Sequence, residues 1–338
     1  MKKCIRLFAL LLSLVMLGTC LFACGDEVDE ATLQEQKVIG TCAGHEVLYE
    51  ELRYVTLAYR QKFEATYGQG IWDNPETAAL YRADFEKTVW GIMRNNYAVL
   101  ALCADYMDPD QMTSSAIMDT VEQQITEAKE AYGGDEGFKQ ALKDMNMTEN
   151  FMRFCLRVSA LESELYYIMT QDLGMIEADQ NNFADWLENG NCVYVQHIYV
   201  GNDQGEDVAA NRAKAEEARR QLIEGEKTVE QLIASAMNED MHNTAPYYIV
   251  RDVYTEVMET AAFSLVNDGD VSEVVETPDG FYVLVRMPEN EQIFVSKIPS
   301  LLKSYQWAKL EEMVEAKKEL ISVELNDYGK TIDLLQIQ

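Results

Sequence analysis

Apolar residues recur along most of the chain at the three- and four-residue intervals that are typical of amphipathic helices. One such stripe begins at Leu52 and a longer one at Phe85, and Thr148 stands as a helix N-cap before another. Asp108-Pro109 and Gly133-Gly134 interrupt the pattern. The pattern predicts a largely helical region, with helical stripes over residues 52–63, 85–103, 111–132, 136–143, 148–169 and 176–188.

The segment from residue 191 to residue 287 has a mixed pattern. Its first strand alternates apolar and polar positions and includes His197, and a later helix opens with a capping box formed by Thr228 and Gln231. The predicted elements are a strand over 195–200, helices over 208–222, 228–237 and 256–265, and strands over 271–276 and 281–286. Strands that alternate with helices predict a compact α/β domain, which opens at the turn Asn189-Gly190-Asn191.

The segments on either side of this domain return to the helical pattern. Structure is expected to begin at Lys37, with a turn at Ala43-Gly44 and a return through Val47 and Leu48. After Pro288, one apolar face continues to about Glu324, and residues 331–335 have strand character.

The first residues of the chain have the pattern of a secretory signal. Basic residues precede the apolar run Leu7 to Leu17, and Leu21-Phe22-Ala23-Cys24 follows. A transmembrane anchor is the weaker interpretation, because the run is shorter than the roughly 20 residues that a span needs. The cysteine at the cleavage point resembles the lipobox of bacterial lipoproteins, which implies that Cys24 is lipidated and that the protein is extracytoplasmic and anchored to the bacterial cell membrane.

Charge excludes one class of partner. The formal net charge is −30, and it becomes −33 when residues 1–23, with three basic and no acidic side chains, are removed. Such a surface cannot neutralise phosphates, so nucleic acid is excluded as a partner. The acidity is best interpreted as a solvated, self-repelling surface.

The cysteines and histidines do not form a metal-binding pattern. Of seven cysteines, Cys4 and Cys20 lie in the predicted signal, and Cys24 is the one that the lipobox resemblance implies is lipidated. The others occur singly, and the three histidines show no ligand spacing, so no metal or cofactor is expected. Cys103 and Cys155 have apolar neighbours and are expected to be buried thiols, whereas disulfides involving the four remaining cysteines, Cys42, Cys103, Cys155 and Cys192, stay open.

The central segment resembles the parvulin (rotamase) family of peptidyl-prolyl isomerases. The resemblance lies in the order of four motifs: a histidine in the first strand, Ala261-Ala262-Phe263 in the last helix, the strand Val271-Ser272-Glu273-Val274-Val275, and Thr277-Pro278-Asp279-Gly280 before the final strand. The resemblance implies a parvulin-like fold over residues 191–288.

The flanking segments resemble the chaperone body of exported foldases. Val38, Gly40 and Glu50-Glu51-Leu52 are similar to the start of a SurA-like chaperone domain. In foldases of the PrsA and SurA type, segments on both sides of the isomerase domain pack together, which implies that the terminal strand pairs near Val38. The expected fold is α+β, a mostly helical body with an inserted α/β domain. The expected divisions are 1–23 signal peptide, 24–36 acidic tether, 37–190 helical region, 191–288 parvulin-like domain and 289–338 C-terminal helix and strand.

The resemblance also implies which residues form the site. His197 matches the first family histidine, Asp240 the Cys/Asp position and Thr277 the hydroxyl, while Tyr282 stands in place of the second histidine. The substrate-binding positions are Tyr254, Met258 and Phe263, and residues 243–246 replace a Gly-Gly loop. Each residue also has a purely structural interpretation: His197 as a core histidine bonded to Thr277, Asp240 as a loop acid, and Tyr254 and Met258 as core filling.

Two functions of different classes follow. The first is an exported, membrane-anchored foldase, a peptidyl-prolyl isomerase whose partners are unfolded or nascent exported polypeptides. The second is a non-catalytic holdase chaperone with a degenerate parvulin domain, which Tyr282 favours. A solute-binding lipoprotein would need two Rossmann-like lobes, and the helical first half argues against it. The sequence leaves the oligomeric state open.

Overall fold

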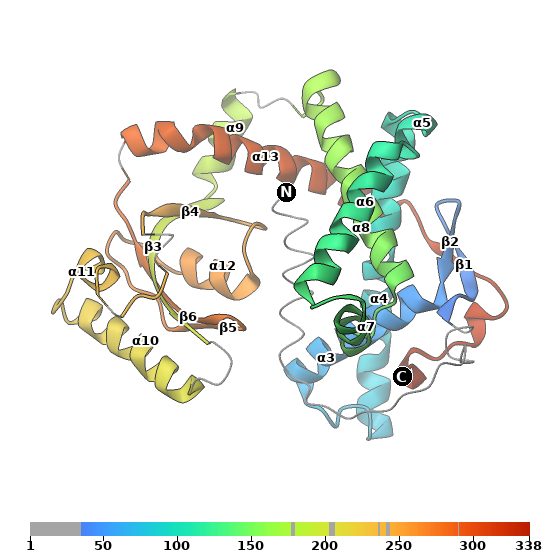
Figure 1. The fold of residues 1–338 in the computed structure, drawn as a ribbon, viewed down its shortest axis with the longest axis horizontal. Coiled ribbons are helices and arrows are strands. Elements are labelled where there is room, and N and C mark those ends of the chain that lie inside the picture. Colours follow the sequence, from blue (N-terminus) through green and yellow to red (C-terminus); the bar gives the residue numbers. More distant parts are fainter. Residues whose placement is uncertain (1–34, 177–179, 203–206, 236, 241–243, 290) are drawn as a thin grey trace. The chain divides into compact units, whose positions relative to one another are not determined.

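The computed structural model describes residues 35–176, 180–202, 207–235, 237–240, 244–289 and 291–338 (Figure 1). Residues 180–308 form one compact unit, called here the inserted unit. Residues 35–176 and 309–338 form a second, called the discontinuous unit. The expected α+β class is confirmed. The predicted signal peptide, Cys24 and the predicted tether up to residue 34 lie outside the described residues.

The sheet of the discontinuous unit joins the two distant parts of its sequence. Its order is β2-β1-β7, with β1 at Val38–Cys42, β2 at His45–Leu48 and β7 at Val323–Leu325, and both pairings are antiparallel. The expected turn between β1 and β2 is present, with positive φ at Ala43 (48°) and Gly44 (81°). The C-terminal segment therefore completes a sheet that the N-terminal segment begins.

The prediction of a terminal strand over residues 331–335 was wrong. Residues Gly329–Thr331 and Leu334–Gln336 form short 3-10 turns, and the Asp333 side chain accepts from the backbone N–H of Leu335. Aspartate at that position favours a turn over a strand because its carboxylate bonds the backbone locally. The strand that pairs with β1 is β7 instead, with Gly40 opposite Leu325 and Cys42 opposite Val323.

Helices form the bulk of the discontinuous unit. They are α3 (Tyr49–Tyr67), α4 (Pro75–Tyr106), α5 (Pro109–Met112), α6 (Ser115–Ala131), α7 (Asp135–Asp144) and α8 (Glu149–Tyr167), with a π-helical turn at Ile168–Asp172. Helix α4 packs against α3 and α8, and α6 packs against α8. Thr148 caps α8 as expected, because its hydroxyl accepts from the backbone N–H of Phe151 at 3.0 Å.

The single helix expected over residues 111–132 is two helices. The Gln111 side chain bonds the backbone N–H of Asp108 at 2.8 Å and closes α5 as a separate turn. Thr113 then ends that turn, since its hydroxyl donates to the carbonyl of Pro109 at 3.0 Å. Ser114 has extended backbone and starts α6 anew.

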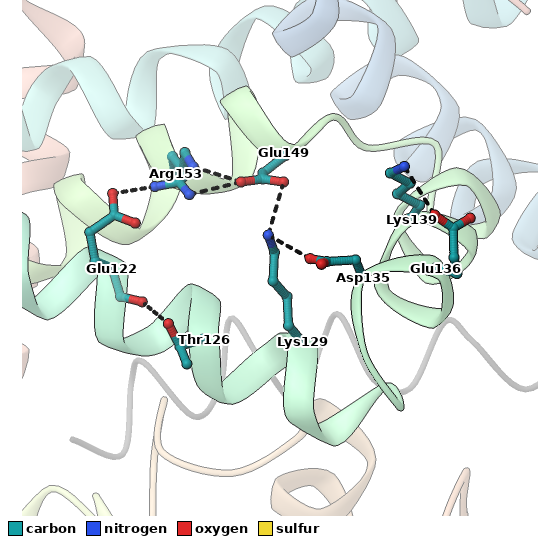
Figure 2. A network of polar contacts seen from close by, with 8 residues as sticks. All are labelled: Glu122, Thr126, Lys129, Asp135, Glu136, Lys139, Glu149 and Arg153. Carbon is teal, nitrogen blue, oxygen red and sulfur yellow. Dashed lines mark hydrogen bonds and ion pairs between the residues drawn. The ribbon is translucent and has the colours of Figure 1, made fainter. Parts of the chain in front are cut away.

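A network of charged side chains ties α6, α7 and α8 together (Figure 2). Lys129, in the last turn of α6, contacts Asp135 of α7 at 2.9 Å and Glu149 of α8 at 3.9 Å. Arg153 of α8 bonds Glu149 and also reaches Glu122 of α6. The cation near the C-terminal end of α6 and the anions at the starts of α7 and α8 suit the helix dipoles. Exposed ion pairs of this kind each contribute little to stability.

The inserted unit is built on a four-stranded antiparallel sheet of order β4-β3-β6-β5 (Figure 1). Its strands are β3 (Cys192–Gly201), β4 (Tyr247–Val250), β5 (Val275–Thr277) and β6 (Gly280–Arg286). Strand β4 was not expected, and β5 is shorter than predicted, with Val271 making only an isolated bridge to Val285. The remaining elements of this unit are the helices α9 (Gln180–Glu188), α10 (Val208–Ile223), α11 (Val229–Ile233), α12 (Glu256–Phe263) and the first part of α13 (Glu291–Glu319).

The sheet buries a different cluster on each face, as the two-residue period of a strand requires. On one face, Ile198 and Val200 of β3 pack with apolar residues of α10, α11 and β6. On the other, Val193 and Val195 pack with Met258 and Ala262 of α12. His197 follows Val193 and Val195 in the alternation and therefore shares the α12 face.

The four cysteines outside the predicted signal and lipid site are free thiols. Cys103 and Cys155 are buried, as expected, and burial raises the pKa of each to about 12. Among the described residues, no helix is both long enough and apolar enough to cross a membrane.

Candidate functional site

His197 occupies the centre of the site. It lies on β3 between β4 and β6, and its side chain is only 4% exposed. Its Nε2 atom is 3.2 Å from Oδ2 of Asp240, and its Nδ1 atom is 3.1 Å from the hydroxyl of Tyr247. Both ring nitrogens therefore have polar partners inside the protein, which satisfies a buried imidazole.

Asp240 is held beside the histidine by a loop fastened to the end of β3. The backbone N–H of Tyr199 donates to the Asn238 side chain at 3.0 Å, and the backbone N–H of Glu239 donates to the Tyr199 carbonyl at 2.8 Å. The buried Asn238 amide also donates to the carbonyl of Asp240 at 2.8 Å. These hydrogen bonds attach the loop to β3 near its end and so position the Asp240 carboxylate.

Aromatic rings surround the histidine. Tyr282 of β6 lies 5.5 Å from the His197 ring, centroid to centroid, at 66°. Tyr199 lies opposite Tyr282 in the β3–β6 register, with their rings 4.7 Å apart. Tyr247 contacts the His197 ring at 5.5 Å and 78°, an edge-on arrangement that aromatic rings favour.

Burial sets the protonation states. Desolvation lowers the pKa of His197, although its contact with the Asp240 carboxylate acts in the opposite direction. Burial raises the pKa of Tyr247 and of Tyr282 above the usual phenol range. At neutral pH the site therefore combines a neutral imidazole with protonated phenols.

The three predicted substrate-binding residues lie on and beside α12. Met258 is buried in the apolar cluster under the sheet, whereas Tyr254 and Phe263 are half-buried at its margin. The Tyr254 ring lies 6.1 Å from that of Tyr247, and the guanidinium of Arg251 lies 3.9 Å above the Phe263 ring. Tyr254 and Phe263 thus keep part of their rings accessible.

Thr277 is not a hydrogen-bond partner of His197, although the purely structural interpretation of that histidine named it as one. The Thr277 hydroxyl donates to the carbonyl of Gly280 at 2.9 Å and closes the turn between β5 and β6. His197 contacts both Asp240 and Tyr282, whereas the Thr277 hydroxyl bonds within its own turn. Within the described residues, no cluster of three or more His, Cys, Asp or Glu side chains is placed to hold a metal ion.

Tyr247 is the residue that sequence reasoning missed. It opens β4, a four-residue strand in a stretch that was expected to be a loop. The run of aromatic and β-branched residues from Tyr247 to Val250 is the feature that could have indicated a short strand. No periodicity, however, indicates that its ring meets His197.

Comparison with known proteins identifies the domain that contains this site. Residues 197–287 match the family model of the PPIC-type PPIase (rotamase) domain. No curated protein matches the chain.

Several solved structures of isomerases align with the chain. PrsA from Bacillus anthracis is 17% identical, with 68% of this chain and 97% of that one covered and a TM-score of 0.30. The foldase PrsA from Streptococcus pneumoniae is 16% identical, with 81% of this chain and 95% of that one covered and a TM-score of 0.37. The peptidyl-prolyl isomerase ESS1 from Candida albicans is 19% identical, with 32% of this chain and 77% of that one covered and a TM-score of 0.25. At these TM-scores the family assignment rests on the domain match, which spans the strand of His197, the loop of Asp240 and the strand of Tyr282. Over residues 197–287 the chain carries a parvulin-type domain of the PPIC-type PPIase family.

Proposed function

We propose that the protein is a peptidyl-prolyl cis-trans isomerase that assists the folding of exported proteins. The contact between buried His197 and Asp240, within the residues that match the PPIase domain, carries this proposal. The proposal includes export and anchoring through lipid on Cys24, for which the support is the sequence pattern of residues 1–24.

The reaction is rotation about an X–Pro bond, which no covalent step accompanies. The barrier is about 18–20 kcal/mol, and uncatalysed rotation takes tens to hundreds of seconds. A planar amide is more charge-separated than a twisted one, so a site that withholds water from the amide carbonyl favours the twisted state. Each ~1.4 kcal/mol of such preference gives a tenfold rate increase.

The residues of the site suit that task. Tyr254, Phe263 and Tyr282 offer partly accessible rings to a proline side chain. The imidazole of His197 is neutral and the phenol of Tyr282 stays protonated, so neither places a charge beside the amide that would stabilise the planar carbonyl. The Asp240 carboxylate lies at the edge of this group and disfavours the negative end of the planar amide dipole.

The test is catalysis of prolyl isomerisation in a proline-containing peptide by a form that begins after Cys24. We expect His197→Ala to lower kcat/KM by about tenfold or more, because it removes the hydrogen-bond partner of the Asp240 carboxylate. Asp240→Asn should lower it to a similar extent, since the charge is lost while the shape is kept. Asp252→Asn is the matched control, because Asp252 is an exposed carboxylate of the same unit.

A non-catalytic holdase is the second candidate, and Tyr282 at the position of the second family histidine favours it. The same preparations can be assayed for suppression of aggregation of an unfolded client. Suppression by the wild-type chain without any isomerase activity would establish the holdase and reject the isomerase. Activity that His197→Ala leaves unchanged would also reject the proposed site.

A further inference from the structure

Tyr247 is the polar neighbour of His197 that comes from β4. Its hydroxyl lies 3.1 Å from Nδ1, and its ring stands edge-on to the imidazole. The contacts between His197 and Tyr282 are ring contacts, whereas the described hydrogen bonds of His197 go to Tyr247 and Asp240. The polar partner of Nδ1 is therefore supplied by the strand that the sequence pattern did not reveal.

The direction of each hydrogen bond follows from the chemistry of the three groups. A neutral imidazole has one N–H donor and one bare acceptor nitrogen. An ionised carboxylate can only accept, so Nε2, 3.2 Å from Asp240, must carry the proton. Nδ1 is then the acceptor, and the Tyr247 hydroxyl donates to it. Burial raises the pKa of Tyr247, which keeps that donor protonated throughout the neutral range.

We propose that Tyr247 is a positioning residue, which holds His197 in the tautomer with the proton on Nε2 and thereby holds the Asp240 carboxylate in place. This inference rests on the proposed isomerase function for its catalytic consequence, but the hydrogen-bond chain Tyr247 to His197 to Asp240 stands on geometry alone. Without the hydroxyl, Nδ1 would be a buried acceptor with no donor, and the tautomer with the proton on Nδ1 would become accessible.

The direct test is nitrogen NMR of the imidazole rings of the full-length chain in detergent. Two-bond proton–nitrogen correlations report which ring nitrogen carries the proton, and His197→Ala identifies the His197 signals among the three histidines. We expect the wild-type ring to be protonated on Nε2, and Tyr247→Phe to mix the two tautomers. Phenylalanine keeps the ring that packs beside His197 and removes only the hydroxyl.

Tyr248→Phe is the matched control. Tyr248 is the next residue of β4, so its side chain lies on the opposite face, where its ring packs 4.9 Å from that of Tyr194. This variant should leave the His197 signals unchanged. Unchanged signals in Tyr247→Phe as well, or a wild-type ring protonated on Nδ1, would overturn the proposal.

Activity provides the second readout. Tyr247→Phe should lower kcat/KM by about fivefold, the effect of losing one ordinary hydrogen bond, while Tyr248→Phe stays at the wild-type value. If the wild-type chain has no isomerase activity, the proposed function fails, and the tautomer measurement still decides the role of Tyr247. Equal activity of Tyr247→Phe and an active wild type would reject the positioning role.

Discussion

Each unit buries ionisable side chains in a core that is mostly apolar. In the inserted unit the example is His197, and in the discontinuous unit Glu50 and Glu51 are 4% and 5% exposed. The Glu51 carboxylate accepts from the backbone N–H of Leu48 at 2.9 Å and from the Tyr97 hydroxyl at 2.7 Å. Burial outweighs these bonds and raises the pKa of Glu51 to about 7.

This shift predicts a pH dependence of stability. The folded state holds the Glu51 proton up to about pH 7, whereas an unperturbed Glu loses it near 4.5, so the folded state binds more protons between these values. The free energy of unfolding of the discontinuous unit should therefore fall as pH rises from about 4.5 to about 7, by at most roughly 1.4 kcal/mol per pH unit from this group.

Glu51→Gln should remove the contribution of Glu51 to this slope. The slope is measured by amide hydrogen exchange over residues 37–67 at several pH values. After correction for intrinsic exchange rates, this exchange gives the free energy of local opening. Glu46→Gln is the control, because Glu46 is exposed and should keep the wild-type slope. A slope that stays at its wild-type value in Glu51→Gln would assign the pH dependence to another group.

At the scale of elements, the hairpin of β5 and β6 depends on one glycine. Gly280 opens β6 opposite Gly201 with a φ of 154°. A Cβ at that position would lie 2.2 Å from the carbonyl oxygen of Val200, which is a backbone atom and cannot move aside cheaply. The turn Thr277-Pro278-Asp279-Gly280 therefore requires glycine for close approach of two strands.

Gly280→Ala should accordingly destabilise the inserted unit by about 3 kcal/mol or more, since a clash with backbone adds to the cost of the left-handed conformation. Gly269→Ala is the matched control: φ there is 87°, but no atom lies within 4 Å of an added Cβ. Gly269→Ala should lower the free energy of unfolding by only about 1–2 kcal/mol. Pulse proteolysis in urea, which follows survival of residues 192–286, compares the two, and equal losses would contradict the clash.

The elements that the sequence predicted well are those with a strong local pattern. The capping box of Thr228 and Gln231 and the N-cap at Thr148 are present because their bonds join residues three apart in sequence. Strand β4 was missed because four apolar residues between loops carry no decisive period. The expected strand over 331–335 failed because a local aspartate bond overrode its apolar alternation.

The site was predicted in part for the same reason. The position of His197 follows from its motif, and its contact with Asp240 needs the loop after α11 to return to β3, which the resemblance implied. Its contact with Tyr247 joins residues 50 positions apart on a strand that was not expected, so nothing local could indicate it.

At the scale of the whole molecule, the discontinuous unit depends on the C-terminal segment. Strand β7 pairs with β1, and the carbonyl groups of Leu334, Ile337 and Gln338 accept hydrogen bonds from Arg53 and Arg60 of α3. Leu334 and Ile337 are each 3% exposed. Leu334 and Ile337 are thus part of the same buried core as β1 and α3.

Deletion of residues 320–338 should therefore destabilise the discontinuous unit and spare the inserted one. We expect much faster amide exchange in β1 and α3, because β1 loses one of its two partners, and unchanged exchange in β3 and β6. Asp327→Ala, at a fully exposed position, should change neither unit. Equal loss of protection in both units would show that they fold as one.

The most direct test of the central claim is exchange NMR between the cis and trans resonances of a proline peptide, with the chain present in catalytic amount. Uncatalysed exchange takes tens to hundreds of seconds and gives no cross-peaks on this timescale. The account predicts cross-peaks with the wild-type chain that disappear with Asp240→Asn and persist with Asp252→Asn. Absence of cross-peaks with the wild-type chain, while it still suppresses client aggregation, would contradict the account and leave the domain as a scaffold without its chemistry.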